Sequence, residues 1–401
     1  GLVVLTALYT IFGGMKSVLY TSVLQTPILL LGSLIILVLG FKELGGWDEM
    51  MRVCGAVTVN DYGDTMTNLI RSNDDANFPW LGALIGSAII GFWYWCTDQF
   101  IVQRVLSGKN EMEARRGTIF GAYLKLLPVF LFLIPGMIAF ALHQKYIGAG
   151  GEGFLPMLEN GTANADAAFP TLVAKLLPAG VKGLVVCGIL AALMSSLASL
   201  FNSSAMLFTI DFYKRFRPQT SEKKLVGIGQ VATVVIVILG ILWIPIMRSV
   251  GDVLYTYLQD VQSVLAPGIA AAFLLGICWK RTSAQGGMWG LISGMVIGLT
   301  RLGAKVYYSN AGEVADSTFK YLFYDMNWLF FCGWMFLFCI IVVIVVSLAT
   351  EAPTAEKIQG LVFGTATKEQ KAATRASWNH WDIIHTVIIL AITGAFYWYF
   401  W

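Results

Sequence analysis

The sequence has few charged residues and a small net charge, and both shortages exclude classes of protein. Only 13% of the 401 residues are charged, whereas 57% are hydrophobic. The mean hydropathy is +0.70, which is typical of a polytopic membrane protein and not of a soluble domain with one core. The formal net charge of +3 is spread over loops, so we do not expect nucleic acid as a partner.

Cysteine and histidine are also scarce. The six cysteines show no paired spacing, which argues against a disulfide framework and against a zinc site. The three histidines lie at or near the ends of apolar segments, so we do not expect a proton relay built on histidine. No nucleophile–base pair or metal cluster occurs in those segments, and we expect that the protein is not an enzyme.

The chain also lacks a methionine at its first position and a charged segment or cleavage site before its first apolar stretch. We therefore expect no signal peptide, and we expect amino-terminal helices to be missing from this chain.

Ten apolar segments are predicted to cross a membrane, because a spanning helix needs about 20 apolar residues. They are residues 2–12, 17–41, 79–106, 117–142, 179–213, 225–247, 253–279, 286–305, 328–348 and 381–401. Two of these helices are expected to be interrupted, one near Gly91 and one around Pro267 and Gly268. Lysine and arginine gather in alternate loops, which predicts a cytoplasmic face for those loops and places Trp401 outside.

Residues 91–104 hold aromatic and polar side chains near the middle of a predicted span. Trp93, Tyr94 and Trp95 lie there, although aromatic residues normally lie at the two interfaces of the bilayer. Asp98 follows within about a turn, and an ionisable residue at that depth is a functional candidate. We expect this helix to line a solute site; the alternative is a buried polar patch that faces another helix.

Lys125 lies roughly nine residues into its predicted span, which is about 13 Å deep at about 1.5 Å per residue. It is either a donor to a bound solute or a lysine whose long side chain reaches back to the interface.

Residues 188–209 are rich in serine. Ser195, Ser196 and the carbonyl of Ala192 offer three neutral oxygens, which suit a monovalent cation such as Na⁺. Close helix packing through small residues is the alternative, and it is the better interpretation for the other serines of this stretch.

The start of the span at residues 253–279 is polar. Gln259 offers both a donor and an acceptor, as a sugar ligand should. Tyr255 and Gln262 lie within a turn of it. A polar helix end exposed outside the membrane is the alternative.

Several of these stretches resemble the sodium–glucose cotransporters of the sodium/solute symporter family, over residues 9–299. The matching motifs are residues 93–99, 103–104, 123–126, 193–197, 201–203, 211–213 and 273–281. The resemblance implies an all-α polytopic membrane protein with the LeuT-like inverted-repeat fold and additional helices. It assigns residues 1–42 to the end of the first repeat, as two helices, and residues 43–78 to an extracellular loop. It assigns residues 79–280 to the second repeat, as five helices of which two are discontinuous, and residues 281–401 to three trailing helices.

The same resemblance implies roles for individual residues. The inner aromatic gate corresponds to Tyr94, flanked by Trp93 and Trp95, and the outer aromatic residue to Tyr255. The sugar-contacting residues correspond to Lys125 and Gln259, and the sodium ligands to Ala192, Ser195 and Ser196.

Three positions depart from the family pattern. Ser22 stands in place of an aspartate associated with passage of the cation. Gly91 stands where relatives carry a polar solute contact, and Gln262 stands where sugar transporters often carry threonine. Both changes fall on the expected solute site.

The implied function is sodium-coupled symport of a hexose-type sugar, such as glucose or galactose, by alternating access. The partners are then Na⁺ as the co-transported ion, the sugar and the lipid bilayer. A sodium/myo-inositol symporter and a sugar-sensing membrane protein that does not accumulate solute are the alternatives. The short outer loops with few cysteines point to a bacterial member in the inner membrane.

Overall fold

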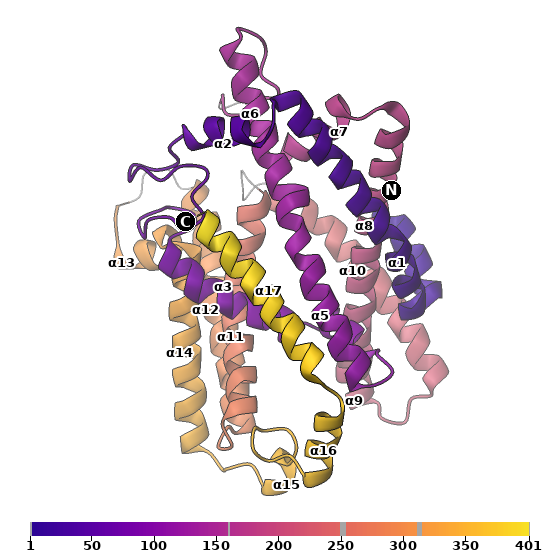
Figure 1. The fold of residues 1–401 in the computed structure, drawn as a ribbon. Helices are drawn as coiled ribbons and strands as arrows, with labels where there is room; N and C mark the ends of the chain where they lie inside the picture. The colour runs from indigo at the N-terminus through magenta and orange to yellow at the C-terminus, as the bar shows by residue number, and fades with distance from the viewer. Residues whose placement is uncertain (1, 159–160, 249–253, 311–314, 401) are drawn as a thin grey trace. The chain divides into compact units, whose positions relative to one another are not determined.

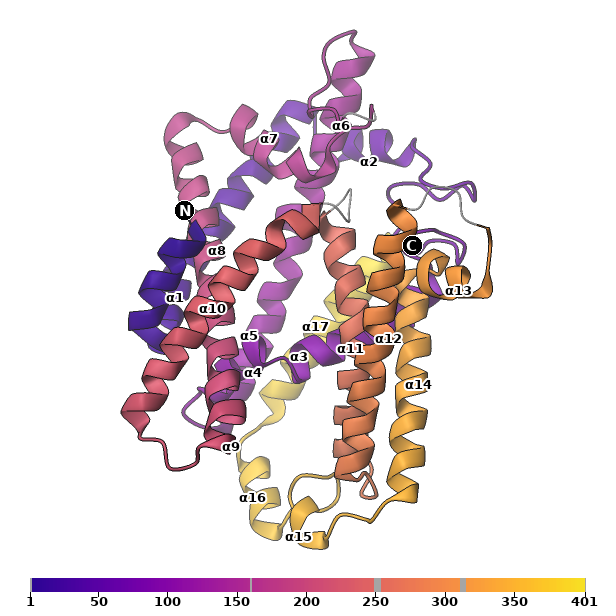
Figure 2. The same ribbon diagram turned by 180° about the vertical axis from the view of Figure 1, so that it is seen from behind.

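The computed structural model describes residues 2–158, 161–248, 254–310 and 315–400. Apart from three isolated β-bridges, the regular elements of these residues are helices, as Figures 1 and 2 show. The prediction of an all-α chain is confirmed.

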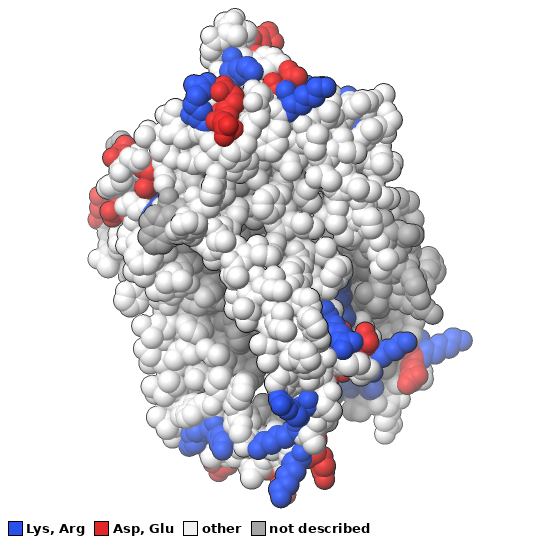
Figure 3. Space-filling view, viewed as in Figure 1, with Lys and Arg blue, Asp and Glu red and all other residues white. Residues whose placement is uncertain are grey.

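Long apolar helices dominate the part of the chain that the structure describes. Seven are long and apolar enough to cross a membrane, or eight if one bent pair counts as a span. They are Thr26–Leu44, Glu111–Gly148, Ala179–Phe216, Glu222–Ile244, Leu258–Cys278, Trp328–Ala349 and His380–Tyr399, with Trp80–Cys96 and Gln99–Leu106 as the bent pair. Charged side chains gather near helix ends, and the flanks between them are uncharged on the face drawn in Figure 3. Helix α12 (Ala284–Asn310), which the sequence predicts as a span, is outside this set and carries Arg301 and Lys305.

The helices form two compact units. The first unit is Gly1–Val59, Thr65–Thr67 and Tyr123–Ser249, and the second is Asn60–Asp64, Asn68–Ala122 and Val250–Trp401. These units are defined by packing and not by internal repetition. They therefore do not test the repeat boundaries given above, which stay predictions.

In the first unit, α1 (Leu2–Leu44) lies beside α8 (Ala179–Met206), and both pack on α10 (Glu222–Arg248) (Figure 1). Small residues permit the close approach, since a Cβ on Gly188 would lie 3.0 Å from Cγ2 of Ile28. This unit also contains α2 (Trp47–Gly55), α6 (Ile134–Gly148), the 3₁₀ turn η2 (Ala165–Ala167), α7 (Ala168–Leu176), α9 (Lys214–Phe216) and the π-helical turns η1 (Val129–Leu133) and η3 (Leu207–Tyr213).

The chain from Leu2 to Leu44 is one continuous helix, and the prediction of two helices in residues 1–42 is wrong. Gly13 and Gly14 lie inside it without a break. A glycine costs only about 1 kcal/mol in a helix, whereas backbone groups that lose their helix bonds in an apolar environment cost several kcal/mol each.

In the second unit, α11 (Leu254–Cys278), α12 and α14 (Trp328–Ala349) lie side by side, and α3 (Trp80–Cys96) packs on α11 and α14 (Figures 1 and 2). The packed residues are Ile89, Ile90, Ala266, Ala270 and Cys332 in one cluster and Val264, Ala271, Phe331, Met335 and Cys339 in another. The other helices of this unit are α4 (Gln99–Leu106), α13 (Thr318–Lys320), η4 (Tyr321–Asp325), α15 (Ala355–Ile358), α16 (Lys368–Ala376) and α17 (His380–Tyr399).

The predicted interruption around Pro267 and Gly268 is absent, because α11 continues through both residues. A Cβ on Gly268 would lie 3.3 Å from Cα of Gly294, which belongs to α12. The glycine therefore marks a close approach of two helices, and it does not mark a break.

Candidate functional site

Helix α3 ends where several donors compete for one carbonyl. The Trp93 oxygen accepts from the backbone N–H groups of Thr97 and Asp98, each at 3.0 Å, and from Oγ1 of Thr97 at 2.7 Å. The Asp98 carboxylate then accepts from the N–H of Phe100 at 3.0 Å and caps the start of α4. The two helices meet at a bend of 47°. The predicted interruption exists, but it lies at Thr97 and Asp98 and not near Gly91, which is inside regular helix.

The aromatic triplet follows Gly91 on α3. A Cβ on Gly91 would meet no atom of the described residues within 4 Å, so they leave this side of the helix open. The Tyr94 ring lies 6.2 Å from the Trp93 ring and 5.2 Å from the Trp95 ring, perpendicular to the latter. Trp93 packs against the cluster around Ile90, whereas the Trp95 side chain is 47% exposed. Tyr94 is partly buried between them, and its gating role stays a prediction.

The polar start of α11 is internally ordered. Nε2 of Gln259 donates a hydrogen bond of 2.8 Å to the Tyr255 hydroxyl, one turn away on the same helix. This bond fixes the orientation of the amide and uses one of its two hydrogens. Gln259 and Gln262 are partly exposed and Tyr255 is 56% exposed, so the face can meet a polar solute.

A charged cluster that the sequence analysis missed lies on the same stretch of α11. Oδ1 of Asp260 lies 3.5 Å from the buried Arg301 guanidinium, and Oδ2 lies 2.5 Å from Nζ of Lys305. The available signal was the presence of two cations four residues apart in a predicted span, because charges at that depth require partners.

Lys125 lies in the last turn of α5 (Glu111–Pro128), whose final residues belong to the first unit. The π-helical turn η1 begins directly after Pro128, and such turns are frequent at functional sites. The Lys125 side chain is exposed. Both interpretations of this lysine, as a donor to solute and as a side chain that reaches for the interface, stay open.

The predicted sodium ligands lie on a regular stretch of α8. Ser195 is buried at 7% exposure, Ser196 is exposed, and Ala192 is partly buried. Neighbouring residues on a helix point about 100° apart, so the two hydroxyl groups face different directions. Helix α8 alone cannot surround an ion with both of them, and further ligands must come from other elements.

The other serines of α8 serve packing. Oγ of Ser199 donates to the carbonyl of Ser195 at 3.0 Å, and Oγ of Ser203 donates to the carbonyl of Ser199 at 2.5 Å. Both side chains are buried, which agrees with the packing interpretation given for these serines.

Gln103 on α4 is a further candidate that sequence reasoning used only as part of a motif. Its side chain is 8% exposed, and neither amide atom has a hydrogen-bond partner in the described part of the chain. A buried amide without partners costs about 1–3 kcal/mol, so it is a place where a polar solute or water would bind favourably.

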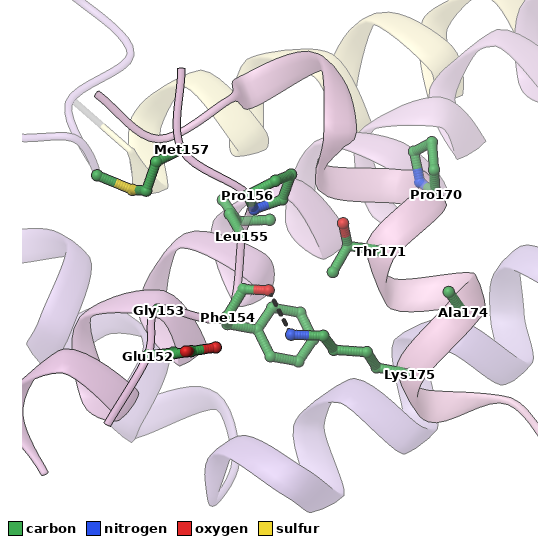
Figure 4. A pocket seen from close by; sticks show the side chains of 10 residues that line it. All are labelled: Glu152, Gly153, Phe154, Leu155, Pro156, Met157, Pro170, Thr171, Ala174 and Lys175. Atoms are coloured by element: carbon green, nitrogen blue, oxygen red, sulfur yellow. Dashed lines mark hydrogen bonds between the residues drawn. The ribbon is translucent and has the colours of Figure 1, made fainter. Parts of the chain in front are cut away.

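A cavity of about 740 Å³ lies in the segment that joins α6 to α7 (Figure 4). Nζ of Lys175 donates to the carbonyl of Phe154 at 2.8 Å and lies 4.7 Å from the centre of its ring. Glu152, Pro156 and Thr171 also line this cavity. None of the predicted solute or ion residues lines it, so it is a different feature from the predicted site.

The predicted residues are divided between the units. The second unit holds Trp93, Tyr94, Trp95, Tyr255, Gln259 and Gln262. The first unit holds Lys125, Ala192, Ser195 and Ser196. The side chain of Ser22 lies outside the described residues.

Known proteins with similar sequences carry sodium and a solute in their names. The chain is 36% identical to the sodium/myo-inositol cotransporter 2 of Homo sapiens, over 91% of this chain and 56% of that protein. It is 36% identical to the sodium/mannose cotransporter SLC5A10 of Bos taurus, over 99% of this chain and 70% of that protein. It is 38% identical to the sodium/glucose cotransporter 1 of Ovis aries, over 87% of this chain and 55% of that protein. The chain thus spans about half the length of two of these relatives.

A solved structure has the same fold. It is the substrate-bound outward-open state of a Na⁺-coupled sialic acid symporter, with a TM-score of 0.65 and 20% identity, over 88% of this chain and 66% of that one. The similarity confirms an all-helical, multi-span membrane protein of the LeuT-like type. The model of the sodium:solute symporter family matches residues 1–294, a stretch that contains every predicted site residue. The chain therefore belongs to the sodium:solute symporter family, a family of transporters and not of enzymes, as its sequence motifs predict.

Proposed function

We propose that this protein imports a hexose-type sugar together with Na⁺ by alternating access. The family match over residues 1–294 carries the proposal, because that range includes all residues assigned to the ion and the solute. The relatives named above differ in their printed solutes, which are myo-inositol, mannose and glucose. A polyol such as myo-inositol is therefore the second candidate solute.

The ion-binding part of the proposal rests on α8. The hydroxyl groups of Ser195 and Ser196 and the carbonyl of Ala192 offer neutral oxygens to Na⁺, with other ligands from elsewhere in the protein. The Ala192 carbonyl lies inside a regular helix, where one lone pair of its oxygen accepts the helix hydrogen bond. The second lone pair of this oxygen would bind the ion. We expect Ser196→Ala to raise the Na⁺ concentration for half-maximal uptake about tenfold, the factor that 1.4 kcal/mol represents. Ser204→Ala, the same change two turns along α8, is the matched control.

The solute-binding part rests on polar groups that are already oriented. The amide of Gln259 is already oriented by its hydrogen bond to the Tyr255 hydroxyl before a solute binds. Such preorganisation lowers the free-energy cost of binding. Lys125 and Gln262 supply further hydrogen bonds, and Tyr94 closes the inner side with Trp93 and Trp95 beside it. Tyr255→Phe keeps the ring and removes this bond, and we expect it to raise the KM for sugar several-fold, about 1 kcal/mol of binding free energy.

The driving force is electrical and chemical. One Na⁺ that enters across 100 mV releases about 2.3 kcal/mol, enough to concentrate a neutral solute on the order of 40-fold at 1.4 kcal/mol per factor of ten. The ion can transmit this free energy only if its binding favours sugar binding, and this coupling is reciprocal.

Uptake into proteoliposomes tests the proposal. Labelled glucose should accumulate under an inward Na⁺ gradient and not under a K⁺ gradient. Competition by unlabelled galactose, mannose and myo-inositol ranks the candidate solutes. Uptake without dependence on Na⁺ would contradict sodium coupling, and a sugar-evoked current without accumulation would favour a sugar sensor.

We assign the protein to the plasma membrane as a multi-pass protein. The relatives compared above are mammalian, and they give no support to the bacterial origin that the short outer loops suggest.

A further inference from the structure

The second unit contains a buried charge cluster next to Gln259. Arg301 of α12 is fully buried and lies 3.5 Å from Oδ1 of Asp260. It also donates to the carbonyl of Met326 at 2.8 Å and to that of Leu322 at 3.5 Å. Its guanidinium carbon lies 4.1 Å from the centre of the Phe331 ring. This one side chain therefore connects α11, α12, the turn η4 and α14.

Asp260 uses both of its carboxylate oxygens inside the cluster. Oδ1 faces Arg301, and Oδ2 lies 2.5 Å from Nζ of Lys305. Its side chain is 14% exposed. Each oxygen already faces a cation and the side chain is largely buried, so we consider an indirect effect of Asp260 on solute binding, through the position of its helix.

Buried ion pairs are poor stabilisers, and this argues for a specific role. Removing charges from water costs several kcal/mol per ion, and apolar residues of similar size often stabilise a protein as well or better. The best-attested benefit of such a pair is that it fixes one arrangement of neighbouring helices. Here the pair joins the first turns of α11 to α12.

Those first turns need such a fixed point. Pro267 lies inside α11 and lacks an N–H, so the helix bond to the carbonyl four residues earlier, at Ser263, is missing. The segment from Leu254 to Ser263 is thus less firmly bonded to the rest of α11. The Tyr255–Gln259 hydrogen bond lies within this segment, and Asp260 follows Gln259 directly.

We propose that Asp260 is a positioning residue: by binding Arg301 and Lys305 it sets the rotation of α11 that directs Gln259 toward the solute. The proposal rests on the proposed function, because it takes Gln259 as a solute contact. According to this proposal, the cluster affects the affinity for sugar and does not affect the binding of Na⁺ to its ligands on α8.

Transport kinetics provide the first test. We expect Asp260→Asn to raise the KM for sugar about tenfold, roughly the contribution of one misplaced hydrogen bond. The maximal rate per transporter in the membrane and the Na⁺ concentration for half-maximal uptake should change less than about twofold, and Asp260→Glu should restore most of the affinity. Asp316→Asn is the matched control, because Asp316 forms an ion pair of 2.8 Å with Lys320 in the same unit but its side chain is 95% exposed.

A double variant tests the proposal even if Asp260→Asn alone fails to fold. Asp260→Asn leaves the buried Arg301 without its counter-charge, which can prevent folding. Asp260→Asn combined with Arg301→Gln removes both charges, and we expect it to reach the membrane and keep the raised KM. A double variant with normal sugar affinity would overturn the proposal.

Hydrogen exchange gives a readout that does not depend on transport. Backbone amides of residues 254–263 should exchange faster in Asp260→Asn or in the double variant than in Asp316→Asn. Unchanged exchange in this segment overturns the proposal. A proportional fall in maximal rate and in Na⁺ affinity also overturns it, since a general structural defect would do the same. If the unaltered protein takes up no sugar, the proposed function fails, while the exchange result still decides whether Asp260 holds the segment.

Discussion

Gly86 tests how closely α3 is seated on α14. A Cβ at this position would lie 2.8 Å from the backbone oxygen and 3.0 Å from Cα of Leu329. Backbone atoms cannot rotate away from a new methyl group as a flexible side chain can, so α3 would have to move. Overpacking of this kind costs about 1–3 kcal/mol.

Gly91 provides the control in the same helix. Within the part of the chain that the structure describes, a Cβ there would meet nothing within 4 Å, and alanine is a better helix former than glycine by about 1 kcal/mol. Gly91→Ala should therefore leave the free energy of unfolding unchanged or raise it, whereas Gly86→Ala should lower it. Both substitutions gain the same helix propensity, because both residues lie inside α3, so the expected difference between the two variants is the overpacking cost of about 1–3 kcal/mol.

Thermal unfolding of the purified protein in detergent, followed by tryptophan fluorescence, measures this difference. We expect a lower Tm for Gly86→Ala than for the unaltered protein and an equal or higher Tm for Gly91→Ala. Equal values for the two variants would show that α3 does not lie against Leu329 at the distances given above.

Three further predictions concern single residues. Asp98→Ala should lower the free energy of unfolding by about 1 kcal/mol through loss of the α4 cap, and Asp98→Asn should not; the Tm of each variant measures this. Burial alone would raise the pKa of Asp75, but hydrogen bonds from two backbone N–H groups and from Asn60, together with the nearby Arg71, lower it below 3.8. Its contribution to stability is therefore present above about pH 3.8 and is lost as the pH falls further, so the Tm should fall in that range and Asp75→Asn should reduce the fall. Burial raises the pKa of the Cys54 thiol to about 11, so a maleimide at pH 8 should leave Cys54 unmodified in the folded protein and modify it after denaturation, as mass spectrometry of the peptides would show.

The sequence predicted features that depend on one helix at a time. Apolar runs located the long helices. The polar start of α11 was also recognised, and two of its residues, Tyr255 and Gln259, are hydrogen-bonded to each other. The break was expected near Gly91, but a glycine alone does not end a helix. The break lies at Thr97 and Asp98, whose capping chemistry ends one helix and begins the next.

Features that depend on two helices were harder to predict. Pro267 and Gly268 indicate a break when α11 is considered alone, and only the nearby Gly294 of α12 shows that the glycine serves close packing. The partner of Asp260 lies about forty residues along the chain, on another helix. No local pattern identifies such a pair, because its members are brought together by packing.

The coupling between ion and sugar is tested most directly by equilibrium binding to the purified protein. Labelled glucose should bind on the order of tenfold more tightly in Na⁺ than in choline, and saturating glucose should tighten Na⁺ binding by the same factor. Ser196→Ala should weaken both effects, and Ser204→Ala neither. Equal affinity for glucose in Na⁺ and in choline would contradict sodium-coupled transport by this protein.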